Sequence, residues 1–558
     1  SVKVDREPVD MSNMDALCDA AKAFVDMKVH GAAPAPYRAI DIIRAQKDCS
    51  IDEGFAMEDE ALGDLIMSDE CRSSVYAFDL VQRRAKRPVG VPEGWPQPIK
   101  KIGIVGAGLM GSQLAILYLR RLKVPIVIKD IKQEFLDKGI SYIRGELDRM
   151  VSKGRMDQGS ADYLFSLIKP TLDYADMADC DFIIEAVLEE IPLKKKVFGE
   201  LEELIPETTI LATNTSSLSI TEMASDLKHP ERVVGFHFFN PVAVLPFLEI
   251  VKAEKTGDQA LVTAFDLAKK IGKRGVRIKD APAFLVNRLL IRMMGECVAL
   301  VDEGNDFKAV DDAMSALGIP MAPFVLMSLV GPAIALHTSE TLAKAFPDRF
   351  SVSANLAKFV EARKASVYGP DGNTDPEVAA LWQQGDKKID AQAMRDRALM
   401  ALTDEAWRIL DEGVVAEPQD IDTGLILGAG YPFFMGGVTK YLDNKGYSEK
   451  VKGRKRHLAT DTLGLLLVVL VTVASVQDRD AAEPLVATAK EKIPTLVKGF
   501  ADGGYAGRGL DRIRDNLGVD IEVVRHPGNR NVGRWHDAQL PLPLVERSDS
   551  GITVLPRR

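Results

Sequence analysis

A glycine-rich turn between a short apolar run and a helical pattern is the feature that most constrains the fold. The residues Gly106-Ala107-Gly108-Leu109-Met110-Gly111 follow the β-rich run Ile102–Val105 and precede a helical pattern over Ser112–Arg121. In such a turn the first glycine permits a tight bend, the second lets the backbone approach a pyrophosphate, and the third lets the helix pack closely on the strand. The helix N-terminus then faces the phosphates. The turn therefore predicts a dinucleotide site at Gly106, Gly108, Leu109, Met110 and Gly111.

An acidic residue stands where such a site needs one. Asp130 lies 19 residues after Gly111, at the end of the β-rich run Ile126–Ile128. A carboxylate there accepts hydrogen bonds from a ribose 2′-hydroxyl and repels a 2′-phosphate, which favours NAD over NADP. Lys129 and Lys132 flank it and weaken the preference. A chance Gly-x-Gly-x-x-Gly is the alternative, but the strand, the helix and the acid at the right distance argue against it.

The periodicity predicts an α/β part followed by an all-helical part. β-rich runs alternate with helical patterns from Ile99 to about Asp280, which favours a mostly parallel sheet with helices on both faces. The runs are Ile102–Val105, Ile126–Ile128, Phe182–Ala186, Thr209–Thr213, Val233–Phe238 and Phe247–Val251. The pattern is helical from Ala283 to about Tyr441. Residues 1–95 read as amphipathic helices with loops, Ala56–Arg87 has helical spacing, and the Pro/Gly-rich Val89–Pro98 predicts a linker.

Charge and apolar content bound the class of protein. A chain of 558 residues predicts three or four domains. The net charge is −10, but Lys450 to Arg558 holds 18 Lys and Arg against 13 Asp and Glu, so this tail carries +5 and the rest carries −15. The acidic bulk disfavours nucleic-acid binding, and the asymmetry marks the tail as foreign in composition. The apolar run Leu463–Val476 is shorter than a membrane helix and predicts a buried strand.

Five scattered cysteines without a Cys-x-x-Cys pattern predict structural thiols in a reduced compartment. The N-terminus has no basic-then-apolar signal pattern, so we expect a cytoplasmic protein without a membrane span.

A histidine and a glutamate form the candidate catalytic pair. His237 ends the run Val233–Phe236 and enters a turn at Asn240-Pro241, and Glu249 follows shortly after. A general base needs a pKa near the working pH and a partner that holds its tautomer, and Glu249 could serve as that partner. A structural histidine is the common alternative. Asn214-Thr215-Ser216-Ser217 follows another β-rich run, although Ser217 or Ser219 could equally cap the helix starting near Ile220.

These residues carry a family resemblance. The stretch from Lys100 to about Tyr447 resembles the L-3-hydroxyacyl-CoA dehydrogenase part of bacterial multifunctional fatty acid oxidation proteins. The matching segments, in order, are Gly106–Gly111, Glu185-Ala186-Val187, Asn214–Leu218, His237–Pro241 with Glu249, Lys279–Pro282, Asn287-Arg288 and Gly428–Gly437.

The resemblance implies a reaction and a set of roles. It implies NAD-dependent oxidation of a 3-hydroxyacyl-CoA to the 3-ketoacyl-CoA, with His237 as the base, Glu249 as its orienting partner, and Ser216 and Asn287 as hydrogen-bond donors to the substrate oxygen. It further implies that Asp130, Glu189, Lys194 and Asn214 line the cofactor. Ala283 stands where the family usually has Gly, and Ala281 where it usually has Thr. Other Rossmann dehydrogenases, acting on sugars or 2-hydroxy acids, would not explain this set.

Both ends resemble other proteins. Residues 1–95 resemble the tail and connecting helix of the hydratase/isomerase domain, whose acids and oxyanion-hole amides would lie upstream, so no hydratase activity is expected. Residues 448–558, including Lys452–Arg456 and Ala501–Tyr505, resemble a DDE-class insertion-sequence transposase. Only Asp502 matches one of its three acids, so we expect neither a bound metal nor strand transfer. A fusion near Tyr447–Lys450 would cut the second helical repeat short and expose its apolar faces.

The predicted organisation is an α/β Rossmann-type NAD-binding domain followed by an all-α dehydrogenase domain, with a helical N-terminal remnant and a partial RNase H-like tail. The boundaries are 1–95, 96–282, 283–385, 386–447 and 448–558. The alternative functions are a catalytically impaired NAD- or acyl-CoA-binding remnant and, less favoured, a DNA-binding recombination protein. By resemblance, candidate partners are a second copy of the chain and a thiolase subunit.

Overall fold

The computed structural model describes residues 12–450, 454–460, 466–473, 478–501, 509–523 and 551–556. The chain divides into two compact units, Ser1–Tyr441 and Leu442–Arg558, which are described separately. The predicted five-part division is finer than these two units and stays a prediction.

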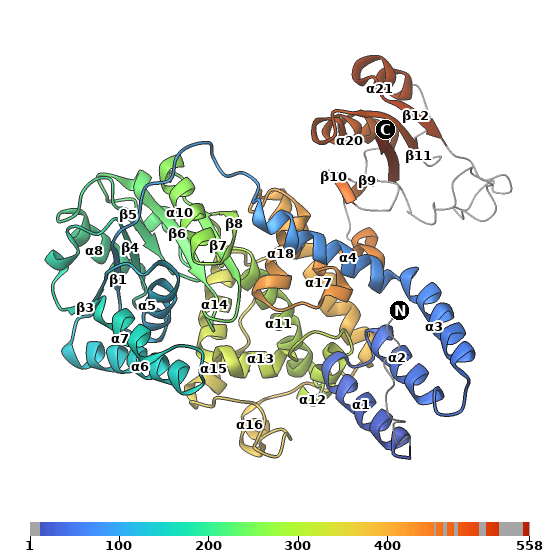
Figure 1. The fold of residues 1–558 in the computed structure, drawn as a ribbon, viewed down its shortest axis with the longest axis horizontal. Coiled ribbons are helices and arrows are strands. Elements are labelled where there is room, and N and C mark those ends of the chain that lie inside the picture. Colours follow the sequence, from blue (N-terminus) through green and yellow to red (C-terminus); the bar gives the residue numbers. More distant parts are fainter. Residues whose placement is uncertain are drawn as a thin grey trace. The chain divides into compact units, whose positions relative to one another are not determined.

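The first unit contains an eight-stranded sheet in the order β3-β2-β1-β4-β5-β6-β7-β8 (Figure 1). The order of its first six strands is that of a dinucleotide-binding doubly wound sheet, whose ligand crevice lies where the strand order reverses, between β1 and β4. The strands are β1 (Ile102–Val105), β2 (Ile126–Lys129), β3 (Ile168–Thr171), β4 (Phe182–Glu185), β5 (Ile210–Thr213), β6 (Val233–Phe238), β7 (Phe247–Lys252) and β8 (Arg274–Lys279). The predicted fold class is confirmed.

All six predicted strands are present, and the sequence analysis missed the two edge strands, β3 and β8. β3 contains Pro170, which cannot donate to a sheet and is tolerated at an edge. The four residues of β3 are partly buried or exposed, so the strand has no apolar run that a sequence pattern could show. Short, half-polar edge strands lack the apolar run by which the central strands were recognised.

Helices cover the sheet and form a shared core with it. α5 (Leu109–Leu122) begins inside the glycine turn and packs on β1 and β2, while α10 (Asp258–Lys270) packs on β6, β7 and β8. The remaining helices of this part are α6 (Gln133–Ser152), α7 (Gln158–Ser166), α8 (Ile191–Glu202) and α9 (Ile220–Met223). The predicted helix over Ser112–Arg121 is α5, which starts three residues earlier than expected.

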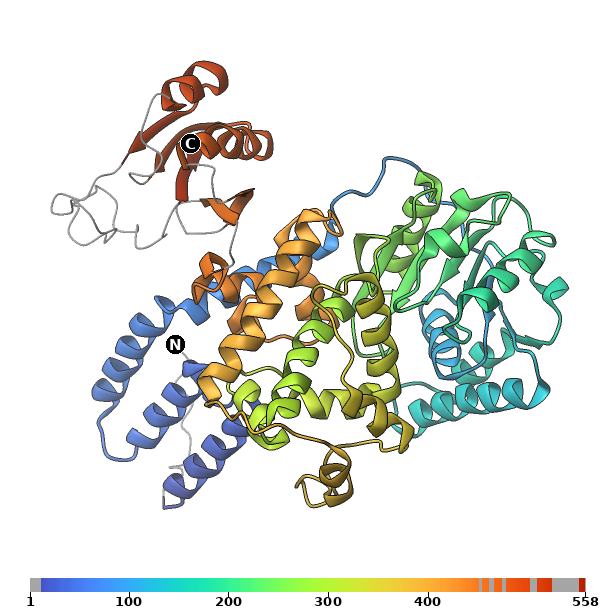
Figure 2. The ribbon, with the colours of Figure 1, turned by 180° about the vertical axis from the view of Figure 1, so that it is seen from behind.

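The predicted all-helical part follows the sheet. Its longest elements, α11 (Val286–Glu303) and α17 (Ala391–Asp411), pack against each other (Figure 2). The others are α12 (Phe307–Ser315), α13 (Pro323–Val330), α14 (Pro332–Ala345), α15 (Ala354–Glu361), α16 (Pro376–Leu381), α18 (Pro418–Gly428), the 3₁₀ turn η4 (Phe433–Met435) and α19 (Val438–Asn444). α18 is buried along its entire length.

The N-terminal helices are α1 (Met14–Val29), α2 (Pro34–Ala45), α3 (Ile51–Ile66) and α4 (Asp69–Gln82). The helical spacing predicted over Ala56–Arg87 is present, divided between α3, α4 and the 3₁₀ turn η1 (Arg84–Lys86). The chain breaks at Ser68, whose hydroxyl accepts a hydrogen bond from the Cys71 N–H at 3.1 Å and so caps α4 as a new helix. As predicted, Val89–Pro98 contains no helix or strand.

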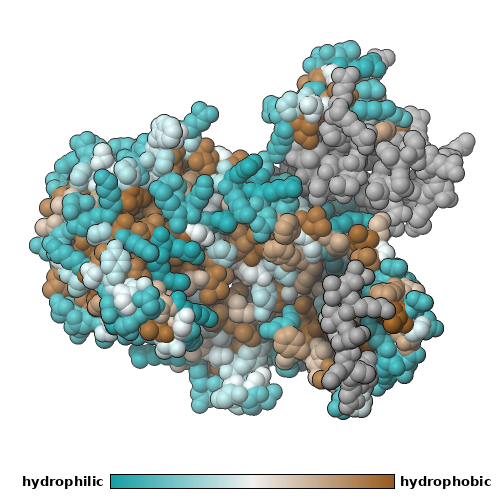
Figure 3. Space-filling view, viewed as in Figure 1, coloured by the Kyte–Doolittle hydropathy of each residue, from teal (hydrophilic) through white to brown (hydrophobic). Residues whose placement is uncertain are grey.

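The prediction that the second helical repeat exposes its apolar faces is wrong for the described residues. Within 386–441 the only large apolar side chain with substantial exposure is Phe433. α4 packs against α18 and η4 and covers them, and the Tyr76 hydroxyl donates to Asp422 Oδ2 at 2.9 Å. Exposed apolar side chains are frequent on the N-terminal helices, among them Ile43 of α2 and Phe55 and Leu62 of α3. Figure 3 shows hydrophobic surface in this part of the molecule.

The second unit contains a five-stranded sheet in the order β10-β9-β13-β11-β12. Its strands are β9 (Arg454–Thr460), β10 (Leu466–Val473), β11 (Leu496–Ala501), β12 (Asp520–Val523) and β13 (Gly551–Pro556), and its helices are α20 (Asp478–Lys492) and α21 (Gly509–Leu517). A small core joins α20 and α21 to the sheet through Leu485, Val486, Ile513 and Ile521. The strand predicted within Leu463–Val476 is β10, and it is paired with β9 in antiparallel register.

All five cysteines are unpaired. Throughout the described ranges, no single helix combines the length and apolar character of a membrane span. Only α13 and α14 taken together, across a bend of 101°, satisfy those two criteria.

Candidate active site

Sheet register brings His237 and Glu249 together. β6 and β7 are the only antiparallel neighbours in the eight-stranded sheet, and their register places His237 directly opposite Glu249. Directly opposed residues project from the same face of a sheet. His237 Nδ1 lies 2.6 Å from Glu249 Oε2, and both side chains are buried. A carboxylate at Nδ1 fixes the tautomer of the ring and leaves Nε2 free to exchange a proton.

The second oxygen of Glu249 is bound by the start of α11. Oε1 accepts hydrogen bonds from the backbone N–H groups of Leu285, at 3.2 Å, and Val286, at 3.0 Å. The first amides of a helix are free donors and carry the positive end of its dipole, so they stabilise a buried carboxylate. The first amides of α11 therefore fix the Glu249 carboxylate in the position where its other oxygen contacts His237.

Aromatic rings enclose the imidazole. The Phe239 ring centroid lies 4.6 Å and the Phe284 centroid 5.9 Å from that of His237. Phe284 precedes α11 and has a φ of +52°, following Ala283 at +56°. The left-handed backbone conformation of these two residues turns the chain sharply into α11.

The polar residues after β5 converge on Glu189. Its Oε1 accepts hydrogen bonds from the Thr215 hydroxyl at 2.6 Å, the Ser216 N–H at 2.7 Å and the Ser216 hydroxyl at 3.1 Å. The Asn287 side-chain amide lies 3.4 Å from the Ser216 carbonyl oxygen. The structure thus places Glu189, Ser216 and Asn287 in one connected group, to which Lys194 also belongs because its Nζ lies 3.2 Å from Glu189 Oε2.

Asn214 and Ser219 hold neighbouring loops. Asn214 Oδ1 accepts the Phe238 N–H at 3.0 Å, which ties the end of β5 to the residue after His237. Ser219 accepts a hydrogen bond from the Glu222 N–H and so caps α9, which is the capping role that the sequence analysis offered for Ser217 or Ser219.

Sequence reasoning assigned no role to Glu185, although it quoted the residue within a motif. Glu185 has no exposed surface, and Lys194 donates to both of its carboxylate oxygens at 2.8 and 2.9 Å. The Lys194 ammonium is itself buried between Glu185 and Glu189. The position of Glu185 could have indicated this role. Glu185 ends an otherwise apolar strand, and an acid buried there requires a charged or hydrogen-bonding partner.

The glycine turn has the shape that a pyrophosphate requires. A Cβ on Gly106, whose φ is +104°, would lie 2.6 Å from the Ala186 carbonyl oxygen, and one on Gly111 would lie 1.9 Å from the Gly106 oxygen. A Cβ on Gly108 would meet no protein atom within 4 Å. Gly106 and Gly111 therefore allow close packing of the backbone. Gly108 faces open space next to the first amides of α5, beside Leu109 and Met110. These residues fit a dinucleotide.

Asp130, directly after β2, is bound to the glycine turn. Its carboxylate accepts the N–H groups of Ala107 and Ile131, both at 2.7 Å. Lys129 lies under the Tyr174 ring, with Nζ 3.7 Å from the ring centroid, and burial lowers its pKa. Lys129 is therefore engaged by the protein. No group of acids, histidines or cysteines suited to a metal ion occurs among the residues described, and Asp502 lies outside them.

Comparison with known proteins finds three matching domains. Residues 101–281 match the NAD binding domain of 3-hydroxyacyl-CoA dehydrogenase, 284–373 match its C-terminal domain, and 435–536 match a transposase DDE domain. The fatty acid oxidation complex subunit alpha of Acinetobacter baumannii (strain SDF) is 33% identical over 457 residues, covering 78% of this chain and 63% of the relative. That of Acinetobacter baylyi is 32% identical over 471 residues, covering 80% and 65%. The chain thus spans just under two thirds of these relatives.

A crystal structure of 3-hydroxybutyryl-CoA dehydrogenase from Escherichia coli K12 shares the fold. It aligns with a TM-score of 0.53 and 24% identity, covering 63% of this chain and 96% of that one.

The doubly wound sheet with its glycine turn is that of an NAD-binding domain. With both domains matched in order, residues 101–373 belong to the 3-hydroxyacyl-CoA dehydrogenase family, and the chain continues into a transposase-derived segment.

Proposed function

We propose that the chain oxidises L-3-hydroxyacyl-CoA to 3-ketoacyl-CoA, as a step of fatty acid β-oxidation. The observation that carries this proposal is the buried His237–Glu249 pair, held at 2.6 Å by strand register and bound from the other side by the first amides of α11. A base whose tautomer is fixed in this way is suited to remove a proton from an alcohol.

His237 is the proposed general base. With Nδ1 held by Glu249, its Nε2 accepts the proton of the substrate 3-hydroxyl group, and Glu249 stabilises the imidazolium that results. The Ser216 hydroxyl and the Asn287 amide are the proposed donors to the substrate oxygen, on which negative charge develops. Both donors are engaged within the protein, by Glu189 and by the Ser216 carbonyl, so substrate binding redirects them.

The cofactor residues are proposed from the shape of the turn and its surroundings. Gly106, Gly108, Leu109, Met110 and Gly111 would hold the pyrophosphate and Asp130 the ribose. Glu189, Lys194 and Asn214 would line the rest of the cofactor. When bound, NAD⁺ supplies the acceptor for the hydride that leaves C3 of the substrate. The proton and the hydride together account for the two electrons and two hydrogens lost by the alcohol.

The remaining expectations belong to the same proposal. They are a cytoplasmic location, a second copy of the chain or a thiolase subunit as partner, and the absence of hydratase and strand-transfer activity.

The test is NADH consumption by purified full-length protein with acetoacetyl-CoA, followed by absorbance. Removing the base in His237→Ala is expected to lower turnover by about 10²–10⁴-fold. NADH binding, measured by the fluorescence of the bound nucleotide, should stay unchanged. Near-normal turnover by His237→Ala would overturn the assignment.

A further inference from the structure

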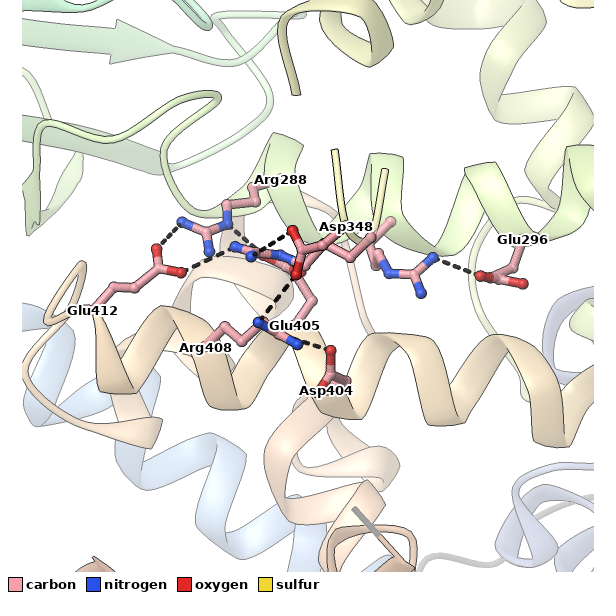
Figure 4. Close-up of polar contacts among 9 residues, drawn as sticks. Arg288, Glu296, Asp348, Asp404, Glu405, Arg408 and Glu412 are labelled. Carbon is pink, nitrogen blue, oxygen red and sulfur yellow. Dashed lines mark hydrogen bonds and ion pairs between the residues drawn. The ribbon is translucent and has the colours of Figure 1, made fainter. Parts of the chain in front are cut away.

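A buried charge cluster joins the start of α11 to α17 (Figure 4). Arg288, in the first turn of α11, has no exposed surface. Its Nε donates to Glu405 Oε1 at 2.5 Å, and its Nη1 lies 2.7 Å from Oε2 of Glu412. Glu405 lies on α17 and is also fully buried, while Glu412 follows directly after that helix.

A second arginine completes the cluster. Arg349 Nε donates to Glu405 Oε2 at 2.8 Å, and its Nη2 donates to Glu412 Oε1 at 3.0 Å. The Phe346 ring lies against both guanidinium groups, 4.5 Å from that of Arg288 and 4.0 Å from that of Arg349. Burial would raise the pKa of Glu412, but hydrogen bonds and charge from Arg288, and then from Arg349, hold that pKa below its ordinary value.

The four groups of the cluster balance, with two cations and two anions. Arg288 and Glu405 at its centre are fully buried, whereas the Glu412 side chain at its edge is 34% exposed. A buried charge that loses its partner is strongly unfavourable, so the cluster resists any displacement of α11 relative to α17. Exposed ion pairs would not impose such a constraint.

The turn of helix fixed by this cluster is the one that serves the candidate active site. Val286, whose N–H binds Glu249, and Asn287, whose amide lies near Ser216, immediately precede Arg288. A shift of the start of α11 would therefore displace the amides on Glu249 and the Asn287 side chain together.

We propose that Glu405 is a positioning residue for the dehydrogenase reaction, acting through Arg288 on the first turn of α11. This inference rests on the proposed function for its kinetic consequence. Glu405 lies beyond residue 373, where the match to the family's C-terminal domain ends, so the later segment 391–412 completes the site.

Glu296 provides a matched control. It also lies on α11 and is bound by α17, through Arg397 Nε at 2.8 Å, but it is farther along the helix and its side chain is 16% exposed. Glu296→Gln removes the same kind of contact between the same two helices without touching the first turn.

The experiment compares Glu405→Gln with Glu296→Gln in full-length protein. Glu405→Gln is expected to lower kcat for acetoacetyl-CoA reduction by about 10- to 100-fold, because small misplacements of reacting groups have effects of that size. The Kd for NADH should stay within about twofold. Amide hydrogen exchange in residues 284–290, which exclude Arg292, the α11 residue that donates to Glu296 at 2.6 Å, should become faster in Glu405→Gln and stay unchanged in Glu296→Gln. Equal losses in both variants, or normal kcat and exchange in Glu405→Gln, would overturn the proposal.

Exchange separates this inference from the proposed function. If the wild-type protein does not consume NADH with acetoacetyl-CoA, the proposed function fails, while the exchange comparison still decides whether Glu405 holds the start of α11. If Glu405→Gln does not fold, Glu405→Asp replaces it. Asp keeps the charge but is too short to bind Arg288 and Arg349 together, so it should show the same faster exchange to a smaller degree. Unchanged exchange in Glu405→Asp would then refute the proposal.

Discussion

His237 and Glu249 are directly opposed across the antiparallel pair β6–β7, and Nδ1 of the imidazole lies 2.6 Å from Glu249 Oε2. They are 12 residues apart in the chain, and the turn containing Asn240-Pro241 returns β7 along β6 to make the contact. The orientation of the histidine is therefore set by backbone register as well as by its side-chain partner.

Glu249→Gln should lower kcat by about 10²–10⁴-fold with little change in NADH affinity. A glutamine at this position can present an N–H to Nδ1 and favour the wrong tautomer, as when the acid of a catalytic triad is replaced by its amide. Steady-state kinetics with acetoacetyl-CoA measure the loss. Glu254→Gln, at an exposed position just after β7, is the control and should behave as wild type. Similar kcat values for the two variants would exclude an orienting role for Glu249.

Gly108→Ala and Gly111→Ala should fail in different ways. A Cβ on Gly108 meets no protein atom, so the variant should fold normally and bind NADH at least about tenfold more weakly, because the methyl group fills the space left for the pyrophosphate. A Cβ on Gly111 would lie 1.9 Å from the Gly106 oxygen, so that variant should lose about 1–3 kcal/mol of stability. Thermal unfolding and NADH titration of both proteins make the comparison. Normal NADH affinity in Gly108→Ala would refute the proposed cofactor position.

Ala283→Gly should stabilise the protein by about 1 kcal/mol. Ala283 is fully buried with a φ of +56°, a conformation that disfavours any residue with a Cβ and suits glycine. This conformation explains why glycine suits the position in the family that the sequence resembles. Ala281→Gly is the control, because Ala281 does not have a positive φ, and glycine there should lower stability by about 0.4–1 kcal/mol. Urea unfolding midpoints that move in the same direction for both variants would contradict the argument.

Asp311→Asn should raise stability at pH 8 and have little effect at pH 4. Burial raises the pKa of Asp311 to about 6, from an ordinary value of 3.8. Between pH 3.8 and 6 the unfolded state gives up this proton while the folded state retains it, so stability falls as the pH rises and then stays level above pH 6. The shift corresponds to at most about 3 kcal/mol. Unfolding midpoints at the two pH values measure the effect, and an equal effect of the substitution at both would show that Asp311 titrates normally.

Local patterns in the sequence predicted much of the fold. The glycine turn, the six central strands and the helical character after Ala283 each depend on residues within one element, where apolar periodicity and glycine chemistry act directly. The resemblance to an NAD-binding dehydrogenase domain and that of the tail to a transposase domain followed from motifs of the same local kind. His237 and Glu249 could be proposed as a pair because they lie close together in the chain.

Features that depend on distant elements were missed or wrong. The edge strands β3 and β8 were missed, because their partly exposed residues form no apolar run and only pairing with β2 and β7 makes them strands. The second helical repeat is covered by α4, in which Tyr76 contacts Asp422 more than 300 residues later in the chain. The periodicity of a sequence cannot predict such a distant contact.

The sequence by itself determined which elements form and which chemistry the site can hold, because strand, helix and turn preferences and the glycine turn are properties of short segments. Only the tertiary structure decided which charges are buried and what neutralises them. Glu185 with Lys194, and Glu405 with Arg288, meet across separate elements, and a carboxylate leaves water only where folding brings a cation and hydrogen-bond donors to it.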